Sequence, residues 1–349
     1  MTIEKPDLED LLAPFSTLGV GSIPFQEGKN SCEEIFTDWD IPFWPQYPLR
    51  SLKENFIFQF LSTFPGLEIA GEKASFDEAE YLRLQNNYRE RLERAYRDDD
   101  FLFFEAPSDS ALGYSQLKSL LTEGRFPEKR VVKLQVTGFN TVWESFFSSR
   151  VLKKTAEGVR ENLQLTLTAA GLAQIQRVKS YDRLPMIFID EPVESKNLSA
   201  LKSMMDSFKK TGAWVGVHVC SSSNWEGFDD LGMHLFHFDL AAHAGLHSAH
   251  QNFLRNFVRN KNWIAWGIIP TSSEVHWRSQ DFSIFLWDCI EKLSTLDLPA
   301  EEIMKHSLIS SSCGTGTLKL EQDQAVSYYI RESWKALQDR LRQKKIKIA

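Results

Sequence analysis

The sequence predicts an α/β protein built on a (β/α)8 TIM barrel, with an elaboration after the second strand. Eight short apolar runs alternate with longer amphipathic stretches, and this alternation is typical of parallel βαβ units. Polar or sulfur-containing side chains follow most of these runs, and the active site of such a barrel gathers at the carboxyl ends of its strands. We therefore expect a single barrel domain over residues 1–349, with its core at about 17–335.

The predicted strands are rich in β-branched or aromatic residues, and turn-forming residues flank them. They cover residues 17–24, 42–48, 131–138, 186–192, 214–220, 234–240, 263–269 and 307–313. Amphipathic stretches that predict helices lie at 151–178, 197–210, 279–295 and 321–345. The segment 49–130 is longer than a crossover requires. It contains a charged helical stretch at 77–98, and we interpret the segment as an insertion within the barrel.

Composition and charge exclude several classes of function. The net charge is −7, whereas a nucleic-acid partner calls for a basic surface. No run approaches the roughly 18 apolar residues of a membrane span, and the acidic N-terminus does not look like a signal peptide. Four cysteines in 349 residues do not form a disulfide framework. We expect a cytoplasmic protein with reduced thiols, and no nucleic acid or membrane as a partner.

The most informative residues are a histidine and two cysteines. His218 and Cys220 lie two residues apart in a predicted strand, so both side chains leave it on the same face. Cys313 ends another predicted strand, just before Gly314 and Gly316. Each residue alone is also typical of an ordinary buried cysteine or core histidine. Together they are three zinc ligands, and a zinc site with three protein ligands keeps its fourth position for water or substrate.

Two further strand ends carry candidate site residues. Asp239 could supply an exchangeable oxygen ligand to the metal, and His237, two residues earlier on the same face, is the competing fourth ligand. Asp190 and Glu191 end another strand, and one of them could hold a substrate ammonium group, although such residues often cap helices. Zinc bound by two thiolates and an imidazole suits a substrate thiol, which the metal converts to the nucleophilic thiolate. This chemistry indicates alkyl transfer onto sulfur.

The ordered set GVGSIP, FWPQYP, LQVTG, FIDEP, HVC, FHFD, AWGIIPT and SSSCGTGT resembles the catalytic barrel of cobalamin-independent methionine synthase. More broadly, it resembles the superfamily shared with uroporphyrinogen decarboxylase and zinc-dependent corrinoid methyltransferases. The resemblance runs over nearly the whole chain, from about 17 to 335. It implies a methyltransferase of methionine biosynthesis that moves a methyl group onto the thiol of homocysteine.

The resemblance also implies roles for individual residues. His218, Cys220, Asp239 and Cys313 correspond to the zinc ligands, with Asp239 where the family has glutamate. Gly21 and Ser22 correspond to the strand end that holds the amino-acid backbone of the substrate. Asp190 corresponds to the active-site aspartate that holds the substrate ammonium.

The sequence departs from the family pattern at several points. The family's full-length synthases carry a second, N-terminal barrel, and this chain corresponds to a single-barrel form. Pro270 stands where the family has the histidine implicated in protonating the folate leaving group. The expected methyl donor is therefore either a methyl-corrinoid such as methylcobalamin, delivered by a corrinoid carrier protein, or methyltetrahydrofolate.

Other functions stay open on the sequence alone. A methyl-corrinoid-dependent enzyme could serve another thiol, such as coenzyme M. A decarboxylase of the uroporphyrinogen type has no use for paired cysteine ligands. A non-catalytic thiol- or zinc-binding protein on an inherited barrel is the alternative from a different class.

Overall fold

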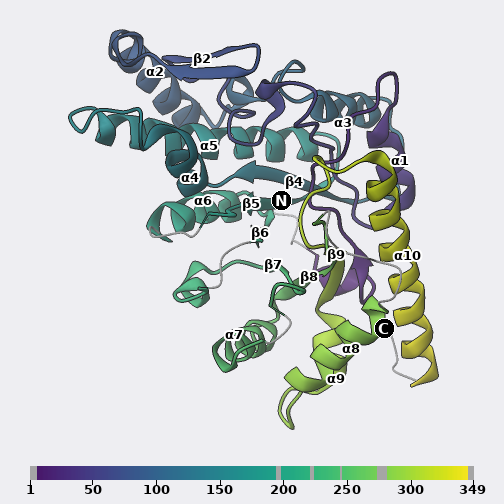
Figure 1. Ribbon diagram of the computed structural model, residues 1–349. Helices are drawn as coiled ribbons and strands as arrows, with labels where there is room; N and C mark the ends of the chain where they lie inside the picture. Colours follow the sequence, from purple (N-terminus) through teal and green to yellow (C-terminus); the bar gives the residue numbers. More distant parts are fainter. Residues whose placement is uncertain (1–5, 194–197, 221–223, 244–245, 273–280, 345–349) are drawn as a thin grey trace.

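A curled sheet of seven parallel strands forms the centre of the protein (Figure 1). The computed structural model describes residues 6–193, 198–220, 224–243, 246–272 and 281–344. The sheet order is β1-β9-β8-β7-β6-β5-β4, and every neighbouring pair is parallel. Its strands are β1 (Ser16–Thr17), β4 (Val131–Thr137), β5 (Leu184–Asp190), β6 (Trp214–Val219), β7 (Leu235–Asp239), β8 (Trp263–Ile269) and β9 (Ser307–Ser311). The sheet curls into at least a half-barrel, so the predicted α/β class is confirmed.

The predicted second strand forms only isolated bridges, which lie between the two edges of the sheet. Residues 41–46 bridge in parallel to the chain after β1, through Leu18↔Ile41 and Ser22↔Gln46, and to β4, through Phe43↔Lys133. The predicted strand 42–48 contains three prolines, at positions 42, 45 and 48. Proline has no backbone N–H to give to a ladder, so a regular strand cannot form there.

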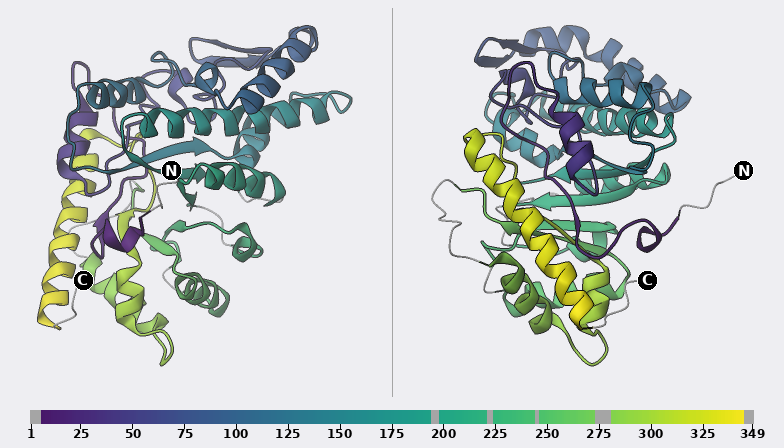
Figure 2. Two further views of the ribbon diagram at one scale, coloured as in Figure 1. Left: turned by 180° about the vertical axis from the view of Figure 1, so that it is seen from behind. Right: turned by 90° about the vertical axis from the view of Figure 1, so that its right-hand side faces the viewer.

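Helices cover the outer side of the sheet. α5 (Ala156–Lys179) packs on β4 and β5, α6 (Leu198–Lys210) on β6, and α10 (Leu320–Gln343) on β1, β8 and β9. Figure 2 shows α10 running along one side of the molecule, close to α1. The remaining helices are α1 (Ser31–Asp38), α2 (Glu78–Asp98), α3 (Leu112–Thr122), α4 (Phe139–Val142), α7 (Ser248–Arg259), α8 (Phe282–Leu293) and α9 (Ala300–Lys305). Among the described helices, none is long and apolar enough to span a bilayer.

The segment 49–130 contains α2, α3 and a small antiparallel hairpin of β2 (Leu67–Ala70) and β3 (Lys73–Phe76). Figure 1 shows the hairpin and α2 at one end of the molecule, beyond α5. Buried residues of α2, including Tyr81 and Leu92, belong to the same apolar cluster as the outer faces of the strands. The predicted charged helix at 77–98 corresponds to α2.

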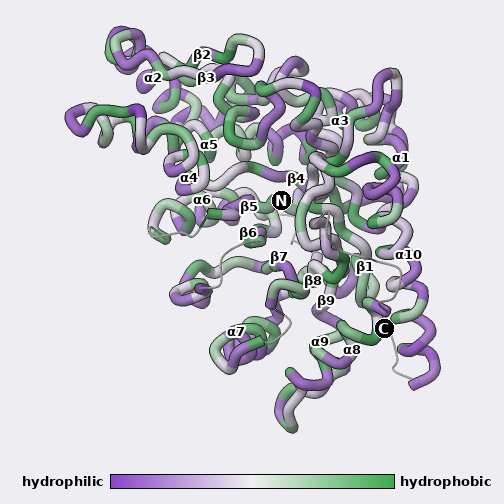
Figure 3. The backbone as a smooth tube through the Cα atoms, in the orientation of Figure 1, coloured by the Kyte–Doolittle hydropathy of each residue, from purple (hydrophilic) through white to green (hydrophobic). Residues whose placement is uncertain are grey.

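Two apolar clusters divide the core. The large one fills the space between the strands and the helices. The smaller one lies inside the curled sheet, near the amino ends of the strands. It includes Met186, Phe188, Trp214 and Leu235. Gly216 makes room inside it, because a Cβ there would lie 2.6 Å from the Phe188 ring. In Figure 3 many hydrophilic residues lie along the outer helix α10.

The other predicted elements lie close to their predicted positions. Both ends of each strand from β4 to β9 lie within two residues of the predicted ends. The helices predicted at 151–178, 197–210, 279–295 and 321–345 correspond to α5, α6, α8 and α10, although residues 197, 279–280 and 345 lie outside the described residues. The strand predicted at 17–24 is reduced to β1 and to the isolated bridges at Leu18 and Ser22.

Candidate metal centre

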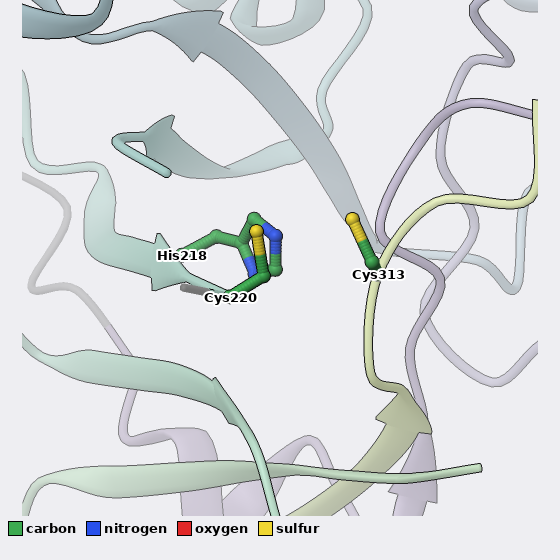
Figure 4. Close-up of side chains that lie close together, drawn as sticks. All are labelled: His218, Cys220 and Cys313. Atoms are coloured by element: carbon green, nitrogen blue, oxygen red, sulfur yellow. The ribbon is translucent and has the colours of Figure 1, made fainter. Parts of the chain in front are cut away.

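His218, Cys220 and Cys313 meet at the carboxyl end of the sheet (Figure 4). One ligand atom from each residue lies within 4.8 Å of the others. His218 belongs to β6, Cys220 follows that strand directly, and Cys313 follows β9. In Figure 4 the His218 and Cys220 side chains lie together and the Cys313 sulfur faces them from the opposite side. The predicted convergence of these three residues is confirmed.

The curl of the sheet creates this cluster. β7 and β8 separate β6 from β9 in the sheet. In a flat sheet three strand spacings amount to about 14 Å, far beyond the reach of one metal ion. The ligand atoms instead lie within 4.8 Å, because the sheet bends until the two strand ends face each other across its mouth.

The donor set and its spacing fit a zinc ion. Around tetrahedral zinc, donors at the usual bond lengths of about 2.0 and 2.3 Å lie roughly 3.5–3.8 Å apart. The cluster, with ligand atoms within 4.8 Å of one another, therefore needs to contract by about 1.3 Å at most to hold the metal. Two thiolates with an imidazole are a ligand combination typical of zinc.

The local environment supports metal binding by each residue. His218 is buried, and burial lowers the pKa of its imidazole well below the ordinary value. It is therefore neutral, which is the form that binds metal. The two thiols hydrogen-bond to each other, and this bond raises the pKa of Cys220 and lowers that of Cys313. The Cys313 sulfur is therefore the readier of the two to become a thiolate.

A cavity of about 230 Å³ opens beside the three ligands. Asp190 lines it together with Ser22, Gln46 and Phe56. Asp190 ends β5 directly beside His218 in the sheet register and is only 9% exposed. Its Oδ1 atom has no hydrogen-bond partner among the described residues. A buried carboxylate oxygen in this condition is costly unless a donor arrives, so the cavity is suited to a ligand with an N–H or ammonium group.

Ser22 holds the loop that carries Cys313. Its carbonyl oxygen accepts a hydrogen bond of 2.8 Å from the Thr315 amide, and its hydroxyl accepts one of 3.3 Å from the Gly316 amide. A Cβ on Gly314 would lie 2.0 Å from the Ser22 hydroxyl oxygen, so glycine permits this approach. Gly21 precedes Ser22 at a φ of 147°, in a conformation that favours glycine. The predicted substrate-binding strand end therefore lies at the cavity and contacts the ligand loop.

Glu191 points away from the three ligands. It is 1% exposed and accepts hydrogen bonds from the backbone and side chains of Thr141 and Asn140, at the start of α4. Adjacent residues of a strand face opposite sides, and Asp190 takes the side that faces the cavity. Burial raises the pKa of Glu191 to about 7. A substrate contact for Glu191 stays a prediction, and the geometry gives it a helix-capping position.

The two candidates for a fourth ligand lie on β7. The Asp239 carboxylate accepts a hydrogen bond from the Ala242 amide at 3.0 Å and is not part of the three-residue cluster. It is near enough that its charge raises the pKa of Cys313. His237 has contacts at both ring nitrogens: Nδ1 faces His218 at 2.5 Å, and Nε2 lies 3.1 Å from the Ser311 carbonyl oxygen. Whether either residue binds the metal stays a prediction.

Two charged residues near the cavity were absent from the sequence prediction. Lys133, on β4, is 2% exposed and donates hydrogen bonds to the Val20 carbonyl and, at 3.2 Å, to Gln135 Oε1. Its burial lowers its pKa, while its charge opposes the rise that burial causes in the pKa of Asp190. A single lysine inside the apolar run VVKLQV was the available signal. Glu54, from the segment 49–130, lines the cavity and binds Arg50, and no sequence signal indicated it.

No protein-family model matches the chain, and no curated protein matches it.

Proposed function

We propose that this protein is a zinc-dependent methyltransferase that acts on the thiol of homocysteine or a closely related amino thiol. The observation that carries the proposal is one arrangement of side chains. Three zinc-type donor atoms lie within 4.8 Å of one another, beside a cavity into which a buried, unsatisfied carboxylate of Asp190 opens. A site for sulfur and a site for an ammonium group thus share one cavity.

We also propose that the fold is a closed (β/α)8 barrel. Residues 41–46 bridge to the chain after β1 and to β4, so they occupy the position of the missing eighth strand. The metal ligands then lie at the carboxyl ends of the strands, where active sites of such barrels are found.

Each residue of the site has a separate role in the proposed reaction. A zinc ion held by His218, Cys220 and Cys313 would bind the substrate thiol in its open position and favour the thiolate. Asp190 binds the substrate ammonium and so directs the sulfur toward the metal ligands. Ser22 maintains the Cys313 loop through its bonds to Thr315 and Gly316. Apolar lining residues such as Phe56 and Pro192 limit the access of water.

The charge of the cavity supports an amino thiol as the acceptor. Among the lining residues that the structure describes, none is lysine or arginine, whereas Asp190 and Glu54 are acidic. A sulfonate thiol such as coenzyme M, or a substrate with several carboxylates, would find no lysine or arginine among these lining residues to neutralise it. An ammonium group finds the free oxygen of Asp190.

A methyl-corrinoid is the donor we favour, and we propose a corrinoid carrier protein as the partner. Methyltetrahydrofolate needs an acid to protonate its leaving nitrogen. The resemblance places Pro270 at the position of the family's histidine, and proline has no proton to give. A corrinoid leaves without such a proton.

The test combines metal analysis with a methyl-transfer assay. Purified protein is loaded with zinc and incubated with homocysteine and either methylcobalamin or methyltetrahydrofolate, and methionine is measured. We expect one zinc per chain and transfer from methylcobalamin, with both lost in Cys220→Ser. Cys289→Ser is the matched control, because Cys289 is a free cysteine on α8 outside the metal cluster.

Three outcomes would contradict parts of the proposal. Zinc content that is unchanged in Cys220→Ser would remove the metal site. Stoichiometric zinc and homocysteine binding without methionine from either donor would indicate a non-catalytic thiol-binding protein. Faster methylation of coenzyme M than of homocysteine would exclude the role given to Asp190.

A further inference from the structure

The imidazole of His218 is the first member of a hydrogen-bonded chain that joins three strands. Its Nδ1 lies 2.5 Å from Nδ1 of His237, on β7, and the rings are 4.5 Å apart at an angle of 50°. The other ring nitrogen of His237, Nε2, lies 3.1 Å from the carbonyl oxygen of Ser311, on β9. His237 is 2% exposed and His218 is 5% exposed.

The positions of the protons follow from the acceptor at the end of this chain. A carbonyl oxygen can only accept, so Nε2 of His237 carries a hydrogen. Both rings are buried, and burial disfavours a charged imidazolium. A neutral His237 with its proton on Nε2 has a bare Nδ1, which accepts. The facing Nδ1 of His218 must therefore donate, and the lone pair of His218 is then on Nε2.

The same chain connects His218 to the segment that presents Cys313. Ser311 precedes Cys313 by two residues, and its hydroxyl donates a 2.8 Å hydrogen bond to the Cys313 carbonyl oxygen. His237 therefore lies between the imidazole ligand and the backbone that carries the second sulfur. Without the His237 side chain, the His218 ring could rotate and could adopt either tautomer.

We propose that His237 is a positioning residue of the metal centre, which holds His218 in the Nδ1–H tautomer so that Nε2 is available to the metal. Neither nitrogen of His237 is then a ligand, because both are used by hydrogen bonds. This inference rests on the proposed metal site and is independent of the methyl transfer. Partners of this kind on metal-binding histidines typically change metal affinity by about 10–100-fold.

The first experiment reads the tautomer directly in the metal-free protein. Nitrogen-15 NMR of ring-labelled histidine distinguishes a protonated from a bare ring nitrogen. We expect His218 to carry its proton on Nδ1 and His237 on Nε2. A His218 protonated on Nε2 overturns the proposal, whatever the protein does with zinc.

The second experiment measures zinc affinity by competition with a chromophoric chelator. In His237→Phe, which keeps a ring but no acceptor, we expect affinity to fall about 10–100-fold. In His237→Asn, whose side-chain oxygen can replace the Nδ1 acceptor, we expect most of the affinity to return. His306→Phe is the matched control: His306 is equally buried but contacts Trp263 and Glu9, and we expect unchanged zinc affinity.

X-ray absorption of the zinc-loaded protein supplies a readout that does not require a folded variant. We expect one imidazole and two sulfurs around the metal. Two imidazoles would make His237 a ligand and overturn the proposal, as would wild-type affinity in His237→Phe. If the wild-type protein binds no zinc, the proposed function fails, while the tautomer experiment still judges His237.

Discussion

Gly316 offers a direct test of the contact that holds the Cys313 loop in place. A Cβ at this position would lie 2.6 Å from Cγ of Pro48 and 2.8 Å from Cβ of Ser22. Neither atom can rotate away, because one belongs to a proline ring and the other is fixed to the backbone. Ordinary contact begins near 3.4 Å, so Gly316→Ala must displace the loop or its neighbours by about 0.6–0.8 Å.

This displacement has two measurable consequences. Overpacking of a close-packed site lowers the free energy of unfolding by about 1–3 kcal/mol. The unfolding entropy of a chain of this length is about 0.7 kcal/mol/K, so the expected fall in Tm is about 1–4 °C. A metal–ligand bond length can vary by only about 0.2 Å. The shift expected at Gly316 is about three times larger and lies three residues from Cys313, so we expect zinc affinity to fall about 10-fold or more. Differential scanning calorimetry and chelator competition measure the two effects.

Gly158→Ala is the matched control for this substitution. Gly158 lies in α5, and a Cβ there would meet its nearest neighbour, Tyr81 Oη, at an ordinary 3.5 Å. Its zinc affinity should equal that of wild type, and its Tm should stay the same or rise, since alanine favours a helix. If Gly316→Ala binds zinc and melts like wild type, the loop is not held by Ser22 and Pro48, and the reasoning is refuted.

Two further predictions concern pH. Glu191 has a native pKa of about 7 against an ordinary value of 4.5, so the native state keeps a proton that the unfolded chain releases between these pH values. The contribution of Glu191 to stability should be fully present below pH 4.5 and fall by about 3 kcal/mol as pH rises through 7. Glu191→Gln should remove this contribution from the pH dependence measured in denaturant titrations, and equal slopes in the two proteins would count against it. Lys133→Met removes the cation that opposes the raised pKa of Asp190, so the pH at which an amino thiol begins to bind better than its des-amino analogue should move upward in calorimetry. An unmoved midpoint would mean that Lys133 does not act on Asp190.

The sequence predicted the regular part of the sheet because local pattern determines it. β4 to β9 are short apolar runs whose residues are buried almost throughout, and such runs are recognisable without tertiary information. The region around residues 41–46 was harder to predict. Its aromatic residues suggest a strand, whereas its prolines remove the donors that a strand needs, and only the tertiary bridges to Leu18, Ser22 and Lys133 place it.

The candidate site was predictable where periodicity decides and unpredictable where tertiary contacts do. The two-residue spacing of His218 and Cys220 fixes a shared face, and the barrel hypothesis brings Cys313 to the same rim. The local sequence does not determine which group hydrogen-bonds to a histidine nitrogen, or toward which element a carboxylate points. The contacts of His237 and the turn of Glu191 toward α4 depend on strands and helices distant in sequence.

Because the ligands come from strands three positions apart, the metal site and the curvature of the sheet depend on each other. His218 and Cys220 move with β6, and Cys313 moves with β9. Flattening of the sheet would separate the two groups toward the roughly 14 Å of three strand spacings, so a metal that bridges them opposes flattening. A ligand that binds only the folded state stabilises it by about 2.7 kcal/mol at 100 times its Kd. Zinc would therefore stabilise the curved sheet as well as prepare the proposed site, and the hydrogen bond from His237 on β7 to Ser311 on β9 joins two strands of the same curve within the protein itself.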